Sequence, residues 1–190
     1  MITGLFFGSF NPIHVGHLII ANYMVEYTPV EEVWFVVSPQ NPLKDKSLLV
    51  NEKHRFEMVK CAIGDDKRFS VSDIEFSMPT PSFTIDTLAV FFKLYPEREF
   101  AIIMGADGLS MFEKWKNQEE IVKSCKRYIY PRIEAGKLNE EKVENGTIVA
   151  APLLNISSTF IRKAIKDGKD LRYFVPENVW LYIHRHGLYL

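Results

Sequence analysis

Apolar runs of strand length alternate with segments of helical period along almost the whole chain, and this alternation limits the folds open to it. Strands that take turns with helices form parallel βαβ units. The sequence therefore predicts an α/β fold in which a doubly wound parallel sheet lies between layers of helices. The expected strands are residues 2–7, 32–38, 69–76, 100–104, 126–130 and 147–151, and the expected helices are residues 15–27, 51–63, 84–94, 117–125, 158–166 and 177–186.

Length and composition narrow the class of protein further. The chain has 190 residues, 47% of them hydrophobic, and shows no repeat or linker, which favours a single domain with an ordinary core. Its net charge of −1 argues against a nucleic-acid-binding or membrane-coating protein. Cys61 and Cys125 lack paired spacing and are expected to be reduced thiols. Since no signal-peptide pattern and no apolar run of about 18 residues occur, the expected location is cytoplasmic.

In a doubly wound sheet, ligands bind beyond the carboxyl ends of the strands. This rule directs attention to residues 8–10, 105–107 and 152–158, each of which follows an expected strand. Any anion bound by a chain of nearly zero net charge must be held locally, at such strand ends.

The first of these places carries polar groups suited to a polyphosphate. Gly8 ends the first apolar run, and a glycine lets a ligand approach the backbone closely. The helix expected from Val15 presents free N–H groups at its start, beside His14 and within one turn of His17. A bound polyphosphate would accept hydrogen bonds from both imidazoles and favour their protonated forms.

Other interpretations of this stretch are weaker. A histidine pair three residues apart can hold a metal, but no nearby carboxylate or cysteine completes a ligand set, so no metal site is predicted. A lone histidine at a helix start is usually a cap or a surface residue. The GxGxxG and Walker A patterns are both missing, which argues against an ordinary dinucleotide site and a P-loop.

Two motifs carry a resemblance to a known superfamily. Residues 8–17, GSFNPIHVGH, resemble the HxGH signature of the nucleotidyltransferases, and residues 156–162, ISSTFIR, resemble their ISSTxIR motif. These enzymes transfer a nucleotidyl group from a nucleoside triphosphate and release pyrophosphate. The resemblance implies a Rossmann-like fold of nucleotidyltransferase type over residues 1–190, in which a C-terminal helical part, about residues 157–190, completes the ATP site.

The second motif also has a physical interpretation of its own. Ser157 and Ser158 can cap a helix or bind phosphate oxygens, and Arg162, one turn along, can form a forked contact with phosphate. By itself this segment is better explained as a capped amphipathic helix with an exposed arginine. Its occurrence together with the first motif favours the phosphate interpretation.

Further segments resemble bacterial nicotinate-nucleotide adenylyltransferases over nearly the whole chain. Residues 81–88, PSFTIDTL, are similar to the PSYTxDTL segment of that family, and residues 105–107 with Trp115 are similar to its GAD…W stretch. The C-terminal residues 173–189 also resemble the family. Three positions depart from the pattern: Phe7 replaces a frequent glycine, Leu43 a frequent histidine and Phe83 the usual tyrosine.

The resemblance assigns roles to particular residues. The expected ATP-binding residues are Gly8, Ser9, Phe10, Asp107, Ser157 and Ser158. The expected catalytic residues, which hold the triphosphate and neutralise the leaving pyrophosphate, are His14, His17, Lys44 and Arg162. The expected nicotinate-binding residues are Thr84 and Lys116, through backbone N–H groups, and Trp115, through stacking. The composition around Trp115 indicates a loop, although a Trp in the core is the common alternative. His54, His184 and His186 are assigned to structure.

The implied reaction joins ATP and nicotinate mononucleotide to give deamido-NAD and pyrophosphate in NAD biosynthesis. The acceptor phosphate is already ionised at neutral pH, so neither a general base nor a covalent intermediate is expected, and positioning carries the catalysis. Mg²⁺ is expected on the ATP phosphates, held by substrate oxygens and water. The alternatives are an adenylyltransferase for nicotinamide mononucleotide or phosphopantetheine and a non-catalytic nucleotide-binding regulator. No nucleic-acid or membrane partner is expected, and a homo-oligomer stays open.

Overall fold

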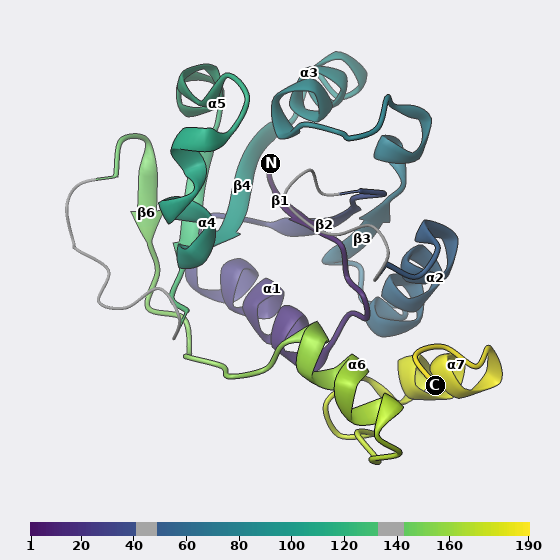
Figure 1. Ribbon diagram of the computed structural model, residues 1–190. Coiled ribbons are helices and arrows are strands. Elements are labelled where there is room, and N and C mark those ends of the chain that lie inside the picture. The colour runs from purple at the N-terminus through teal and green to yellow at the C-terminus, as the bar shows by residue number, and fades with distance from the viewer. Residues whose placement is uncertain (41–48, 133–142) are drawn as a thin grey trace.

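Six parallel strands form one sheet in the order β3-β2-β1-β4-β5-β6. The structure is a computed structural model, and it describes residues 1–40, 49–132 and 143–190. The strands are β1 (Ile2–Gly8), β2 (Glu32–Val37), β3 (Phe69–Ser72), β4 (Glu99–Gly105), β5 (Lys126–Tyr130) and β6 (Gly146–Ile148). This order and the flanking helices confirm the expected doubly wound α/β fold, shown in Figure 1.

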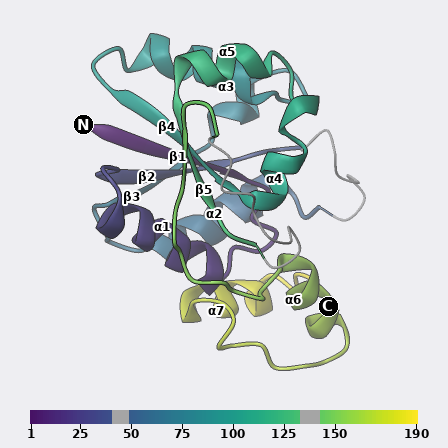
Figure 2. The same cartoon turned by 90° about the vertical axis from the view of Figure 1, so that its left-hand side faces the viewer.

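Helices cover both faces of the sheet. They are α1 (Val15–Tyr27), α2 (Glu52–Ile63), α3 (Thr84–Leu94), α4 (Ala106–Ser110), α5 (Gln118–Ser124), α6 (Ser158–Lys166) and α7 (Glu177–Arg185), with short 3₁₀ helices η2 (Ile74–Ser77) and η3 (Phe112–Lys114). Helices α3, α4 and α5 lie on one side, and α1, α2, α6 and α7 on the other (Figures 1 and 2). None of the helices in the described segments is long and apolar enough to cross a membrane.

The central strands β1, β2 and β4 are mostly apolar because both faces of the sheet are buried there. Neighbouring side chains point to opposite faces of a strand. Leu5 therefore packs in the cluster under α3 and α5, whereas Phe6 packs in the cluster under α1 and α2. Trp34 and Phe35 divide between the two clusters in the same way.

Most expected elements are confirmed, and their boundary signals work as predicted. Asn51 caps α2 by accepting a hydrogen bond from Lys53 N across 2.9 Å, and Gly64, at a φ of 55°, follows the last turn. The expected strand 147–151 is the shorter β6. Helix α4 was not foreseen.

One expected strand was partly wrong. Residues 69–72 form β3, but the chain then turns into η2 instead of continuing to residue 76. Local hydrogen bonds replace the ladder here, because Ile74 N–H donates to Ser72 Oγ and Phe76 N–H donates to the Asp73 carbonyl. The turn points Glu75 inward, where its side chain is buried.

The strand order places the ends of β1 and β4 side by side at the point where the connections diverge. The C-terminal helices return to this edge of the sheet. His54 Nδ1 on α2 and Tyr182 Oη on α7 lie 2.9 Å apart, and Figure 2 shows α6 and α7 together beyond α1 and α2. Residues from both ends of the chain thereby reach one edge of the sheet.

Candidate active site

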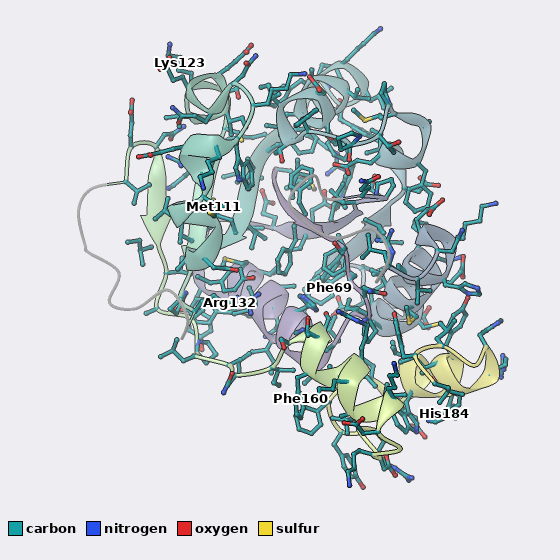
Figure 3. The ribbon with its side chains drawn as sticks, viewed as in Figure 1. Phe69, Met111, Lys123, Arg132, Phe160 and His184 are labelled. Carbon is teal, nitrogen blue, oxygen red and sulfur yellow. The ribbon has the colours of Figure 1, made fainter. Side chains whose placement is uncertain are left out.

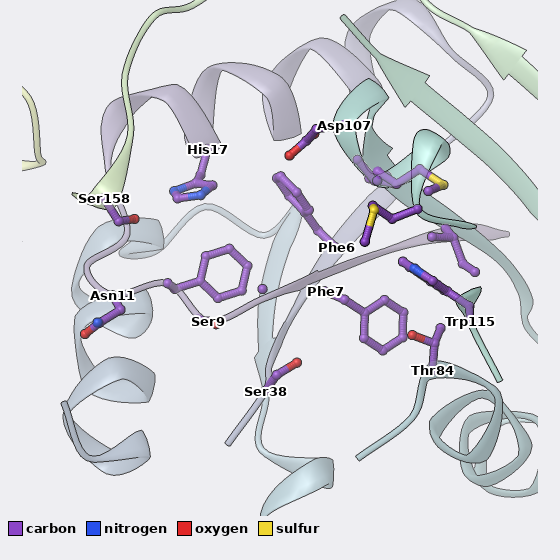
Figure 4. Close-up of a pocket in the computed structure, with 18 of the residues that line it drawn as sticks. Phe6, Phe7, Ser9, Asn11, His17, Ser38, Thr84, Asp107, Trp115 and Ser158 are labelled. Atoms are coloured by element: carbon purple, nitrogen blue, oxygen red, sulfur yellow. The ribbon is translucent and has the colours of Figure 1, made fainter. Parts of the chain in front are cut away.

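A cavity of about 810 Å³ opens beyond the carboxyl ends of the parallel strands. Its walls come from the turn after β1, the ends of β2, β4 and β5, and the first residues of α3 and α6. His17, Ser158 and Asn11 lie toward one end of the cavity, and Thr84, Trp115 and Phe7 lie toward the other (Figure 4). The position agrees with the rule that directed attention to the strand ends.

The turn after β1 is closely packed around an aromatic ring. Phe10 has a φ of 43°, and its side chain is buried among Phe6, Phe35 and His17. A Cβ added at Gly8 would come within 2.7 Å of the Phe10 ring. Glycine is therefore required at position 8 by this internal contact, in addition to the close ligand approach that the sequence suggested.

The two histidines of the first motif stack on each other. The ring centroids of His14 and His17 lie 3.7 Å apart, and the rings are inclined by 24°. The His14 N–H donates to His17 Nδ1 across 3.2 Å. Since Nδ1 accepts, a neutral His17 carries its proton on Nε2. The helix start thus fixes the tautomer and makes Nε2 a donor for a ligand in the cavity.

His14 is uncharged in the protein alone. Its side chain is buried, and burial together with the nearby Arg132 guanidinium lowers the pKa of His14 to about 3. Within the described part of the chain, His14 Nδ1 and the hydroxyl of Ser9 are buried polar atoms without a hydrogen-bond partner. The expectation of a protonated histidine pair depends on a bound polyphosphate, and it stays a prediction. Buried polar atoms that line a cavity are the groups that a polar ligand would satisfy.

The second motif meets the first directly. The Ser158 hydroxyl donates to the Pro12 carbonyl across 2.9 Å, and Arg162 Nη1 donates to the Asn11 carbonyl across 2.8 Å. Ser157 caps α6 by accepting a hydrogen bond from Phe160 N. Two helix starts that are remote in sequence therefore border one space, as the phosphate interpretation requires.

Asn11 links this turn to the end of the chain. Its side-chain Oδ1 accepts hydrogen bonds from the Tyr189 hydroxyl at 2.8 Å and from Val50 N at 3.3 Å. Burial raises the pKa of Tyr189, so its hydroxyl stays protonated and donates. The C-terminal residues thus stabilise the turn that carries the histidines.

A buried arginine links the turns at one edge of the cavity. Arg55 is 0% exposed, and its guanidinium donates to the carbonyl oxygens of Ser9, Ser38, Pro39 and Val50 at 2.7–2.9 Å. These carbonyls belong to the turn after β1, the turn after β2 and the approach to α2. Arg55 therefore fixes two strand ends relative to each other.

The opposite end of the cavity is aromatic. Thr84 begins α3. Trp115 lies in the turn between η3 and α5 and is half-buried, and its ring centroid lies 5.2 Å from that of Phe112. This confirms the loop position expected for Trp115. Lys116 Nζ pairs with Asp86 at 2.8 Å and lies over the Phe83 ring. The ring of Phe83 keeps the aromatic surface of the usual tyrosine without its hydroxyl.

Arg132 is a residue that the sequence motifs missed. It follows β5, lines the cavity, and its Nε lies 3.6 Å from Asp107 Oδ1, with its guanidinium over Tyr130. In Figure 3 it lies between the segment that carries Met111 and the helix that carries Phe160. A basic residue after the fifth apolar run was the available signal, because ligand-binding residues gather at strand ends.

The structure gathers almost all predicted site residues around the one cavity. Those that line it are Gly8, Ser9, Phe10, His14, His17, Thr84, Asp107, Trp115, Lys116, Ser157, Ser158 and Arg162. Lys44 lies outside the described residues. Their individual roles stay predictions.

Comparison with known proteins gives consistent matches over the full length. The cytidylyltransferase-like family matches residues 5–164. A protein of Christiangramia forsetii named "Probable nicotinate-nucleotide adenylyltransferase" is 49% identical over 189 residues, covering 98% of this chain and 97% of the relative. One of the same name from Cytophaga hutchinsonii is 50% identical over 179 residues, covering 94% and 93%.

A solved structure with the same fold is the nicotinic acid mononucleotide adenylyltransferase of Plasmodium falciparum complexed with NaAD. It superposes with a TM-score of 0.82 over 99% of this chain and 97% of the other, at 21% identity. At this identity the likeness concerns the fold alone.

Proposed function

We propose that this chain, which belongs to the nicotinate-nucleotide adenylyltransferases within the cytidylyltransferase-like family, transfers the adenylyl group of ATP to nicotinate mononucleotide. The products are deamido-NAD and pyrophosphate. The single observation that supports this most strongly is the direct contact of the two motifs, Ser158 with Pro12 and Arg162 with Asn11, at the edge of one cavity.

The chemistry needs positioning more than proton transfer. An oxygen of the acceptor phosphate attacks the α-phosphorus of ATP and forms the new P–O bond. The bond from that phosphorus to the α,β-bridging oxygen breaks, and pyrophosphate leaves with the electron pair. The attacking phosphate is already ionised, so no residue has to remove a proton.

In this proposal the residues around His14 and His17 stabilise the negative charge of the phosphates. His17 Nε2–H would donate to the phosphates, whereas Val15 N and His17 N at the start of α1 already donate to the carbonyls of Phe174 and His14. Arg162, with Lys44 from outside the described residues, neutralises the departing pyrophosphate. Ser157 and Ser158 contribute at the start of α6, and Asp107 faces the adenylate ribose. Residues 157–190 thus complete the ATP site of a single domain.

Mg²⁺ enters the proposal as part of the substrate MgATP. Among the described residues, no group of three or more His, Cys, Asp or Glu side chains could hold a metal ion. In this proposal the triphosphate and water would hold the ion, which is the usual coordination of Mg²⁺ in nucleotide sites. The ion would reduce the charge of the phosphates while the protein holds their orientation.

The aromatic end of the cavity receives the acceptor base. Trp115 stacks on the pyridine ring, and the backbone N–H groups of Thr84 and Lys116 donate to its carboxylate. A carboxamide would turn an NH₂ group toward one of these donors and leave a buried N–H unpaired. We therefore propose a preference for nicotinate over nicotinamide mononucleotide.

The test is an assay of product formation with MgATP and one acceptor at a time. Nicotinate mononucleotide should give deamido-NAD and pyrophosphate with the highest kcat/KM, and nicotinamide mononucleotide should be poorer. Equal constants for the two would instead support a dual-specificity enzyme. Turnover with phosphopantetheine alone would support the related acceptor class, and ATP binding without turnover on any acceptor would support a regulator.

The cellular setting is part of the same proposal. Cys61 and Cys125 are both free thiols, which supports a reducing, cytoplasmic location. The proposed partners are the small-molecule substrates, without nucleic acid or membrane.

A further inference from the structure

The carboxylate of Glu75 is buried against hydroxyl groups at the acceptor end of the cavity. Glu75 is 2% exposed, Ser82 Oγ donates to its Oε2 across 2.5 Å, and Thr87 Oγ1 donates to its Oε1 across 2.9 Å. The Ser38 hydroxyl is a further partner. Every recorded partner of this carboxylate within the described segments is thus a hydroxyl group. Burying a carboxylate without a cation is costly, so the arrangement calls for a reason.

The partner hydroxyls come from different segments of the acceptor end. Ser38 follows β2, Ser82 precedes α3, and Thr87 lies in the first turn of α3. Glu75 itself, Ser38 and Ser82 line the cavity. Glu75 therefore joins η2, the end of β2 and the start of α3 into one wall.

Thr84 lies between two of the residues that Glu75 holds. Helix α3 begins at Thr84, and the first N–H groups of a helix have no partner inside it. The Phe83 carbonyl accepts from Asp86 N and Thr87 N at 3.0 and 3.2 Å, which closes the first turn. With Ser82 fixed before this turn and Thr87 fixed within it, the direction of the Thr84 N–H is set from both sides.

We propose that Glu75 is a positioning residue for the acceptor substrate. It holds the start of α3 so that the Thr84 N–H faces the carboxylate of nicotinate mononucleotide. This inference rests on the proposed function. The proposal predicts that loss of these hydrogen bonds weakens binding of the acceptor more than binding of ATP. The Glu75 hydrogen bonds support the acceptor end of the cavity, whereas the ATP end is built from α1 and α6.

The experiment removes the hydrogen bonds one at a time with variants that preserve shape. Ser82→Ala and Thr87→Val each remove one donor, and Glu75→Gln removes the charge. Ser77→Ala is the matched control, because the exposed Ser77 hydroxyl donates to the Ile74 carbonyl at 3.1 Å on the same 3₁₀ helix and does not line the cavity. KM for each substrate and melting temperature are measured for every variant.

We expect KM for nicotinate mononucleotide to rise by about tenfold in the three variants, since a hydrogen bond to a charged group contributes roughly that factor. KM for ATP should stay within about twofold of wild type, and Ser77→Ala should match wild type. The ratio of kcat/KM for nicotinate over nicotinamide mononucleotide should fall.

The outcomes separate the two proposals. A wild-type protein that makes no deamido-NAD refutes the proposed function. An active wild type whose variants leave both KM values unchanged, or raise both equally, overturns the role of Glu75. If all three variants fail to fold, the role of Glu75 is structural and the positioning proposal is likewise overturned.

Discussion

The Ser158 hydroxyl donates a hydrogen bond to the Pro12 carbonyl across 2.9 Å, although the two residues lie 146 positions apart in the chain. Arg162 makes a parallel contact one turn further along α6, to the Asn11 carbonyl. The first turn after β1 is thereby held by the start of α6. The hydroxyl has one proton, so in the protein alone this proton serves the link between the motifs and not a ligand.

Ser158→Ala should weaken this link. The Pro12 carbonyl loses its donor, and we expect the free energy of unfolding to fall by about 1 kcal/mol, with KM for ATP raised several-fold. Urea denaturation and steady-state kinetics measure the two effects. Ser77→Ala removes a comparable hydroxyl-to-carbonyl bond outside the cavity and serves as control. An unchanged KM for ATP would show that the contact is only structural.

His17→Ala should separate catalysis from stability. The variant loses the Nε2 donor aimed at the phosphates, and we expect kcat to fall by about 10²–10³-fold, as for other removed transition-state donors. His17 is only half-buried, so the melting temperature should change by a few degrees at most. The exposed His184 provides a control substitution, His184→Ala. Near-normal turnover of His17→Ala would remove this residue from the site.

Arg132→Gln tests the residue that the motifs missed. Its guanidinium lies beside Asp107 and over Tyr130 at the cavity wall. Loss of this positive charge should raise KM for ATP by about tenfold, because charge-assisted contacts to phosphate are among the stronger hydrogen bonds. Arg172→Gln, at an exposed arginine that pairs with Asp170, is the matched control. Equal KM values for ATP in the Arg132→Gln and Arg172→Gln variants would contradict a role of Arg132 in binding ATP.

Arg55→Met should be strongly destabilising. The substitution leaves the carbonyl oxygens of Ser9, Ser38, Pro39 and Val50 without the guanidinium that now serves them. Several buried acceptors without partners should lower the free energy of unfolding by about 3 kcal/mol or more. Denaturant titration against Arg172→Met measures this. A loss below about 1 kcal/mol would show that water can replace the guanidinium.

His14 should make stability depend on pH in the acidic range. The pKa of His14 is about 3 in the folded protein and 6.5 in the free group. Between these values the unfolded chain binds a proton at His14 and the folded protein does not. Stability therefore rises with pH between these values and levels off above 6.5, with a slope of up to about 1.4 kcal/mol per pH unit from this group.

Replacement of His14 isolates this contribution. In His14→Gln the position cannot titrate, so the drop in unfolding free energy between about pH 7 and about pH 5 should be smaller than in wild type. Urea denaturation at both pH values gives the difference, and the carboxylates cancel in the comparison. An identical drop in both proteins would mean that His14 is protonated in the fold.

The sequence by itself determined the sheet and the chemistry of its edge. Alternating buried strands and helices predict a parallel sheet between layers of helices, because each apolar strand needs cover on both faces. The boundary signals at Asn51 and Gly64 are local, since capping involves residues only a few positions apart. The motifs around His14 and Ser158 could be recognised from the sequence because each lies within a short run of consecutive residues.

Only the tertiary structure decided which groups act together. Arg55 and Glu75 carry no local pattern that marks them, and Arg132 is marked only by its place after an apolar run. The partners of all three lie in other segments of the chain. The turn of residues 74–77 into a 3₁₀ helix likewise brings Glu75 to hydroxyls that a continued strand would have kept from it. A buried charge needs hydrogen bonds to offset its lost hydration, and in this protein the fold brings distant segments together to supply them.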